Sequence, residues 1–208
     1  FLYDHSINVA ILSLSLGREM SVSGKDLLIL GAGGLLHDVG MFDLPEELLR
    51  VGRKFTEDER KVVQTHPERG ARLLQDSRLK KAFSRLSLQE QEREDGSGYP
   101  HRLRGEEIEH LAKIVGFCDS IESVTHFRPH RAPRSFFDGF SLLLGQSRDQ
   151  FPRHLWLAAL RRITPYPPGS LVKLSSGKLA RVHKPNPETP MKPVVELLEH
   201  EDGAGTEH

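Results

Sequence analysis

Four segments of this chain carry side chains of the kinds that hold metal ions in proteins. In chain order they are His5, the adjacent pair His37 and Asp38, His66, and Asp119. Neutral imidazole and carboxylate together suit iron, manganese, zinc and similar divalent ions. Each of these residues alone is better explained as a buried, hydrogen-bonded side chain. Their joint order along the chain is what predicts a metal centre.

The pair His37 and Asp38 limits where such a centre can form. Neighbouring residues of an α-helix point about 100° apart, because of the helical repeat. Both side chains can therefore serve one site only near a helix end. At that position the Asp38 carboxylate could also bridge two metal ions.

The composition is that of a soluble globular protein. A chain of 208 residues can hold one good-sized core with a small appendage. Equal numbers of acidic and basic residues, 29 each, leave no global field to favour nucleic acid or an anionic membrane, so we expect no DNA or RNA partner. The single cysteine excludes an internal disulfide and suits a reducing compartment, so we expect a cytoplasmic protein.

No apolar run reaches the roughly 18 to 20 residues that a membrane span needs. The chain opens without an initiator methionine, and Phe1 leads directly into a helical pattern. We therefore expect an upstream region to be missing from this sequence.

The first part of the chain predicts a mainly α fold. Apolar residues with a helical period run from Ile7 to Leu16 and end at Gly17. A second helix, over residues 25–37, is apolar nearly all round, so we expect it to be buried, with its glycines at close approaches of neighbouring backbones. Gly40 then stands where a left-handed helix terminus would be expected.

Two later helix starts are predicted by the spacing of capping residues. Thr56-Glu57-Asp58-Glu59 and Thr65-His66-Pro67-Glu68 both have the spacing of a capping box. The second places His66 at the mouth of a helix. Further helical segments are expected over residues 79–88, 108–125, 135–145 and 151–163.

From residue 164 the pattern changes from helical to strand-like. Residues 171–174 and 179–182 flank Ser175-Ser176-Gly177-Lys178, which predicts a hairpin, and residues 194–198 would add a third strand. We expect residues 1–163 to form a helical domain, 164–199 a small β-rich extension, and 200–208 a disordered tail.

Four segments, in this order and at suitable spacing, resemble those of the HD-GYP family of metal-dependent phosphodiesterases. They are Leu35 to Gly40; Thr65 to Glu68; Glu92 to Pro100, with the glycine-rich run Asp95-Gly96-Ser97-Gly98-Tyr99-Pro100; and Phe117 to Asp119, followed by Arg128 to Arg131. The resemblance covers roughly residues 1–135 and implies an HD-superfamily helical bundle.

The resemblance also implies an activity, which is metal-assisted hydrolysis of cyclic di-GMP to linear pGpG. It implies two divalent metal ions, iron or manganese, with Asp38 as the catalytic bridge between them. The implied metal ligands are His5, His37, Asp38, His66 and Asp119. The implied substrate-binding residues are Tyr99, beside the nucleotide, and Arg128 and Arg131, at its phosphates.

The chain departs from the family pattern at positions that concern catalysis more than folding. Glu90 and Gln91 stand where the family has two histidines. Glutamate can still bind a hard or borderline metal, so we count Glu90 among the expected metal ligands, whereas glutamine is a poor ligand. Met41 replaces a lysine whose charge would help to hold phosphate. Phe1 stands where some members carry a glutamate ligand. Gln91 and Phe1 both argue against a third metal ion. His126-Phe127 replaces the usual Ser-Asp.

Two hypotheses therefore remain open. The first is a working but divergent phosphodiesterase, and the second is a degraded module that binds cyclic di-GMP, or a signalling partner through the glycine-rich loop, without turnover. The metal-binding residues favour the first, and Met41 and Gln91 favour the second. A distant third is an HD phosphohydrolase that acts on another nucleotide.

Overall fold

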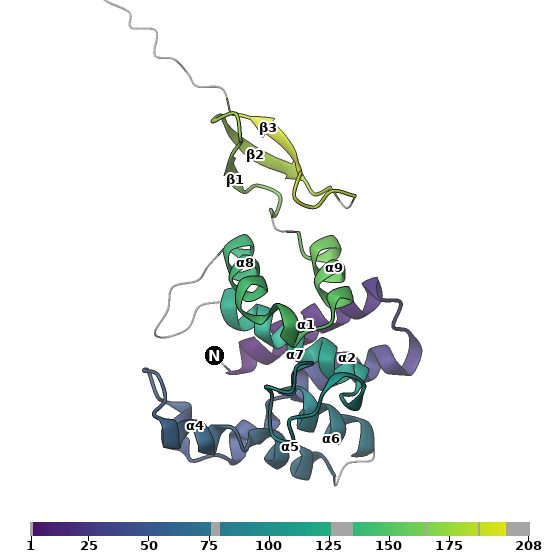
Figure 1. Ribbon diagram of the computed structural model, residues 1–208, viewed down its shortest axis with the longest axis vertical. Helices are drawn as coiled ribbons and strands as arrows, with labels where there is room; N and C mark the ends of the chain where they lie inside the picture. Colours follow the sequence, from purple (N-terminus) through teal and green to yellow (C-terminus); the bar gives the residue numbers. More distant parts are fainter. Residues whose placement is uncertain (1, 76–79, 126–134, 165, 187, 199–208) are drawn as a thin grey trace, which may run out of the picture. The chain divides into compact units, whose positions relative to one another are not determined.

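The structure, a computed structural model, describes residues 2–75, 80–125, 135–164, 166–186 and 188–198. These residues fall into two compact units that divide between Ala159 and Leu160. The first unit is helical and the second holds a small antiparallel sheet (Figure 1), which confirms the mainly α fold class. The predicted tail, residues 200–208, lies outside the described residues.

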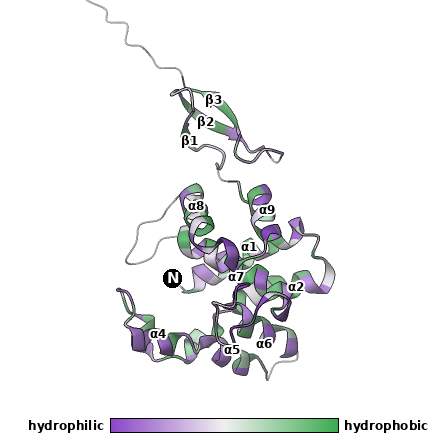
Figure 2. Ribbon diagram, in the orientation of Figure 1, coloured by the Kyte–Doolittle hydropathy of each residue, from purple (hydrophilic) through white to green (hydrophobic). Residues whose placement is uncertain are grey.

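Helices joined by loops build the first unit, and hydrophilic and hydrophobic residues alternate along them (Figure 2). The α-helices are α1 (Leu2–Glu19), α2 (Gly24–Leu36), α3 (Glu46–Leu49), α4 (Glu57–Val63), α5 (His66–Gln75), α6 (Lys80–Gln89), α7 (His110–Thr125), α8 (Phe136–Ser147) and α9 (Arg153–Arg162). Short 3-10 helices are η1 (Val39–Asp43), η2 (Gly105–Glu107) and η3 (Arg148–Gln150).

Helices α1 and α2 pack closely because glycines leave room for side chains of the facing helix. A Cβ added to Gly17 would lie 2.3 Å from a methyl carbon of Leu30, and one added to Gly31 would lie 2.9 Å from Leu14. The close backbone approach expected at the glycines of α2 is found at Gly34, where an added Cβ would lie 2.9 Å from Ala10 Cα, whereas Gly31 faces a side chain. The tight pairing brings the start of α1 close to the end of α2.

The predicted burial of α2 was partly wrong, because its Leu28 is 75% exposed. On α1, Ile7 and Ile11 of the apolar period are 49% and 60% exposed. The buried face of α1 instead carries small and polar side chains, such as Ser13 and His5, beside apolar ones. The apolar period therefore did not mark the face that packs, because that face is shaped by the close helix contact and by the polar site.

Gly40 was predicted to end a helix in the left-handed conformation, and this was wrong. It lies inside η1, and the glycines with positive φ among the described residues are found elsewhere, at Gly96 for example. A Cβ on Gly40 would lie 2.0 Å from the carbonyl oxygen of His66. The glycine is needed because η1 runs against the backbone at the start of α5.

One of the two predicted capping boxes forms. Thr56 and Glu59 make the reciprocal bonds of a capping box at the start of α4. The hydroxyl of Thr65 instead donates to the carbonyl of Val62 and accepts a bond from Arg69 Nε. Thr65 thus links α4 to α5 within the described residues.

Helix α7 is the central element of the core. Its inward residues are buried as expected, namely Ile114, Val115, Phe117, Cys118 and Ile121. The ring of Phe117 packs edge-on against Trp156 and Phe151, with centroids 4.9 Å and 5.2 Å away. This aromatic contact anchors α7, which also carries Asp119.

The second unit contains the predicted hairpin and third strand. The strands are β1 (Leu171–Lys173), β2 (Leu179–Lys184) and β3 (Val194–Leu197), antiparallel in the order β1-β2-β3. Leu171 pairs with Arg181, and the register between β2 and β3 shifts near Val182. Gly177 turns the hairpin with a φ of 85°. Nowhere in the described residues is a helix long and apolar enough to cross a membrane.

Candidate metal centre

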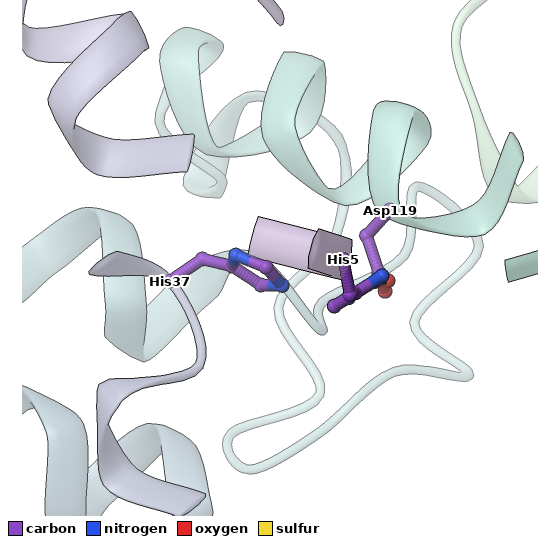
Figure 3. A group of neighbouring side chains, drawn as sticks. All are labelled: His5, His37 and Asp119. Atoms are coloured by element: carbon purple, nitrogen blue, oxygen red, sulfur yellow. Dashed lines mark ion pairs between the residues drawn. The ribbon is translucent and has the colours of Figure 1, made fainter. Parts of the chain in front are cut away.

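Five different segments of the helical unit bring their polar side chains to one place. His5 comes from α1, His37 and Asp38 directly follow α2, His66 begins α5, Glu90 directly follows α6, and Asp119 lies on α7. Figure 3 shows three of them, His5, His37 and Asp119, lying close together. The structure therefore brings together all six residues that the sequence predicted as metal ligands.

The first cluster consists of His5, His37 and Asp119. One possible ligand atom from each lies within 4.8 Å of the others. His5 Nε2 is 3.2 Å from Asp119 Oδ1, and the two imidazole rings have centroids 5.2 Å apart. Both histidines are buried.

The second cluster consists of Asp38, His66 and Glu90, whose ligand atoms also lie within 4.8 Å of one another. His66 Nε2 is 3.2 Å from Glu90 Oε1 and 3.3 Å from Asp38 Oδ1. Glu90 is fully buried. A Cβ on Gly116 would lie 2.1 Å from the Glu90 carbonyl oxygen, so this glycine lets α7 approach the second cluster.

Asp38 lies between the two clusters and faces both. Its Oδ2 is 3.7 Å from His5 Nε2 and 3.6 Å from His37 Nε2, while its Oδ1 is 3.3 Å from His66 Nε2. This is possible because the α-helix ends at Leu36 and Asp38 has left the helical conformation, with φ −95° and ψ 13°. The expected placement of the pair near a helix end is confirmed.

All three imidazoles direct Nε2 into the site, because Nδ1 is engaged on the outer side. Nδ1 of His37 is 2.8 Å from the carbonyl of Gly34, and Nδ1 of His66 is 2.9 Å from the carbonyl of Val63. Nδ1 of His5 is 2.5 Å from a carboxylate oxygen of Glu122. A hydrogen bond at the outer nitrogen fixes the tautomer that leaves Nε2 free to bind a metal.

Within the part of the chain that the structure describes, two buried atoms of the site have no hydrogen-bond partner, namely His37 Nε2 and Glu90 Oε2. Buried polar atoms are normally satisfied, so unpaired ones require an explanation such as an ion. Imidazole nitrogens and carboxylate oxygens are ligands that divalent iron, manganese and zinc accept. The side chains of both clusters therefore fit divalent metal ions.

The histidines are surrounded by carboxylates, and this changes their protonation. Burial lowers the pKa of His5, but hydrogen bonds with Asp119 and Glu122 outweigh it and raise the pKa to about 10. Burial also lowers the pKa of His66, and the hydrogen bond with Glu90 contributes most to raising it to about 9. In the metal-free protein these histidines thus hold protons that a metal ion would displace.

The pKa values of two carboxyl groups of the site shift in opposite directions. Burial raises the pKa of Glu90 above its ordinary value. Burial acts in the same direction on Asp119, but contacts with His5 and His37 outweigh it and hold the pKa of this carboxyl below its usual range.

The glycine-rich loop lies beside the second cluster. Glu92, which is buried, accepts hydrogen bonds from the backbone amides of His101 at 2.7 Å and Leu103 at 3.0 Å. A Cβ on Gly98 would lie 2.5 Å from Glu92 Cα, so the chain can fold back here only with glycine. The Tyr99 ring lies edge-on to His66 with centroids 6.2 Å apart.

Sequence reasoning missed the residues that support the ligands from behind. Glu122 was one of them, although its place three residues after Asp119, on the same face of the helix, was a usable signal. Gln91 was considered only as a poor ligand, yet its Nε2 donates to Asp119 Oδ2 at 3.2 Å. The predicted phosphate-binding residues Arg128 and Arg131, with His126 and Phe127, lie outside the described residues.

The fold and the site together define a helical protein with two adjacent clusters of histidine and carboxylate side chains that could hold metal ions. A sequence model of the HD domain family matches residues 1–153. The chain is 31% identical to the cyclic di-GMP phosphodiesterase PA4108 of Pseudomonas aeruginosa, in an alignment that covers 95% of this chain and 48% of that protein. It is 30% identical to the 3'3'-cGAMP-specific phosphodiesterase 1 of Vibrio cholerae, over 69% of this chain and 33% of that protein.

Among solved structures, the HDG"Y"P protein Bd1817 of Bdellovibrio bacteriovorus matches with a TM-score of 0.64 and 21% identity, over 76% of this chain and 51% of that chain. The chain thus spans about half the length of PA4108 and of Bd1817. It belongs to the HD domain family and, within it, to the HD-GYP group. Membership of this family implies binding of divalent metal ions.

Proposed function

We propose that this chain is a divergent metal-dependent phosphodiesterase domain that hydrolyses cyclic di-GMP to linear pGpG, with reduced activity. The observation that carries the proposal is the position of Asp38, whose two carboxylate oxygens face two separate clusters of ligand atoms. The similarity to PA4108 across 95% of the chain supports cyclic di-GMP as the substrate.

We propose that the six residues of the two clusters hold two divalent ions, iron or manganese. Bound there, the ions would supply an activated water and positive charge for the phosphate oxygens. The chain holds its ligand atoms in place through the outer hydrogen bonds of the histidines. Asp38, set between the clusters, would tie both ions to one carboxylate.

The glycine-rich loop is the proposed contact for the nucleotide. Tyr99 lies next to His66 and would place its ring beside a base of the substrate. The buried Glu92 carboxylate fixes the loop from below, while Asp95 and Ser97 are exposed. This exposed side of the loop is also the proposed contact for a signalling protein. Arg128 and Arg131 remain proposed phosphate ligands.

A second candidate function is binding of cyclic di-GMP without turnover, and Met41 is the residue that favours it. Met41 lies in η1, where its backbone amide donates to the Asp38 carbonyl at 2.8 Å. A methionine there cannot supply the positive charge of the lysine that the family pattern has at this position. Loss of one electrostatic contact to a transition state typically costs on the order of 10²- to 10³-fold in rate.

The experiment that separates the two functions is a product assay on the purified protein. Manganese- or iron-loaded protein is incubated with cyclic di-GMP and, in parallel, with 3'3'-cGAMP, and products are separated by chromatography. We expect pGpG from cyclic di-GMP, no product with Asp38→Ala, and normal product with the surface control Asp58→Ala. Tight nucleotide binding with no product after long incubation would support the second function. Faster cleavage of 3'3'-cGAMP would overturn the substrate assignment.

The contribution of Met41 has its own test. Met41→Lys should raise the rate of pGpG formation if the missing charge limits turnover. An unchanged rate in a metal-loaded variant would remove that explanation for reduced activity.

A further inference from the structure

Glu122 is a buried carboxylate that belongs to neither cluster but contacts one of the proposed ligands. It is 1% exposed and lies on α7, one helical turn after Asp119. Its Oε2 is 2.5 Å from His5 Nδ1, and its Oε1 accepts a bond from Asn8 Nδ2 at 3.2 Å. Both oxygens therefore have partners on α1.

This contact makes His5 different from the other two histidines of the site. The outer nitrogens of His37 and His66 face neutral backbone carbonyls, of Gly34 and Val63. The outer nitrogen of His5 faces an acidic side chain. A carboxylate at this position withdraws the Nδ1 proton more strongly than a carbonyl, which makes Nε2 a better donor to a metal ion.

We propose that Glu122 is a positioning residue that sets the orientation and the donor strength of His5, and thereby the metal affinity of the first cluster. The inference rests on the proposed metal-binding function of that cluster. With Nδ1–H donated to Glu122, Nε2 is the ring nitrogen that faces Asp119 and Asp38 and that a metal ion would bind. Asn8 holds the Glu122 carboxylate in the orientation that makes this bond.

The effect of the Glu122 charge can be tested apart from the effect of its side-chain shape. Glu122→Gln keeps the length of the side chain and an oxygen that can accept from His5 Nδ1, but removes the negative charge. Loss of an outer partner of a metal-binding histidine typically weakens metal affinity about 10- to 100-fold. A role limited to packing would lower the unfolding temperature and leave the affinity of the folded protein unchanged.

The test is a calorimetric titration of Mn²⁺ into metal-stripped protein that circular dichroism shows to be folded. His5→Ala should abolish Mn²⁺ binding at the first cluster and so identify that binding event. We expect Glu122→Gln to weaken the Mn²⁺ affinity of the same event by about 10- to 100-fold, and Asn8→Ala to weaken it less. The control is Ser120→Ala on the same helix, because the Ser120 hydroxyl bonds only the Gly116 carbonyl in the described residues; its affinity should equal that of the wild type.

The outcomes distinguish this inference from the proposed function. If wild type and His5→Ala bind Mn²⁺ equally, the metal-binding function of the cluster is wrong. A second outcome is that His5→Ala loses Mn²⁺ binding while the Mn²⁺ affinity of Glu122→Gln stays within about twofold of the wild type, which is less than mutation of an outer partner typically causes. That result would overturn the role of Glu122. Should Glu122→Gln fail to fold, Asn8→Ala decides, since an unchanged affinity in that variant would also overturn the role.

Discussion

The side-chain amide of Gln91 donates a hydrogen bond to Asp119, with Nε2 and Oδ2 3.2 Å apart. On its other end the same amide accepts a bond from Arg93 Nη2 at 3.4 Å. Gln91 therefore supports a proposed metal ligand from behind. The family pattern has a histidine at this position. In this chain the glutamine instead holds a proposed ligand, Asp119, through a hydrogen bond.

Removal of this support should destabilise the protein. Gln91→Leu keeps a similar volume but removes the donor, which leaves one oxygen of the Asp119 carboxylate without its partner. A hydrogen bond to a charged group contributes about 1.5–3 kcal/mol, and we expect the lower end because Asp119 is partly exposed. The measurement is urea unfolding of metal-stripped wild type and variant, and an unchanged midpoint would contradict the supporting role.

The close approach of α7 to the second cluster gives a prediction about packing. Gly116→Ala should destabilise the protein by about 1–3 kcal/mol, because overpacking forces the backbone apart and the new Cβ would meet the Glu90 carbonyl oxygen at 2.1 Å. The matched control is Gly145→Ala on α8, where no atom of the described residues beyond the local helix backbone lies within 4 Å of the added carbon. This control should be neutral or stabilising by up to about 1 kcal/mol. Equal effects of the two changes would contradict the described packing.

A dependence of stability on pH follows from the two raised histidine pKa values. His5 and His66 have pKa values of about 10 and about 9, against an ordinary value of 6.5. A pKa raised by folding contributes stability that is complete below the unfolded-state value and is lost as the pH rises through the folded-state value. The metal-stripped protein should therefore lose stability between pH 6.5 and about 10.

The check is the urea midpoint measured in chelator across this pH range. His66→Asn should flatten the slope, because it removes one of the two histidines whose pKa is raised. A midpoint that rises with pH would contradict the assigned pKa directions.

The meeting of the six expected ligand side chains could be predicted from sequence, because these residues are few, chemically distinctive and fixed in order. The strands could also be predicted, since short apolar runs flank a glycine turn at Gly177. The helix boundaries followed from period and capping, as Thr56 shows.

Other features depend on contacts between segments that are far apart in sequence. The exposure of Ile7 and Ile11 follows from which face of α1 meets α2, and the local period does not contain that information. Gly40 is needed for its approach to His66, 26 positions later, and a local rule about helix ends gave the wrong reason. The contact of Glu122 with His5 depends on the packing of α1 against α7, which the sequence around either residue does not specify.

The central claim is that Asp38 joins two metal sites, and metal content tests it most directly. We expect two manganese or iron ions per chain in the wild type, one in His37→Ala and one in His66→Ala, because each of these changes removes a ligand of one cluster. Asp38→Ala should lose both ions, because its two oxygens face both clusters. Two ions retained in Asp38→Ala, or a single ion in the wild type, would contradict the account.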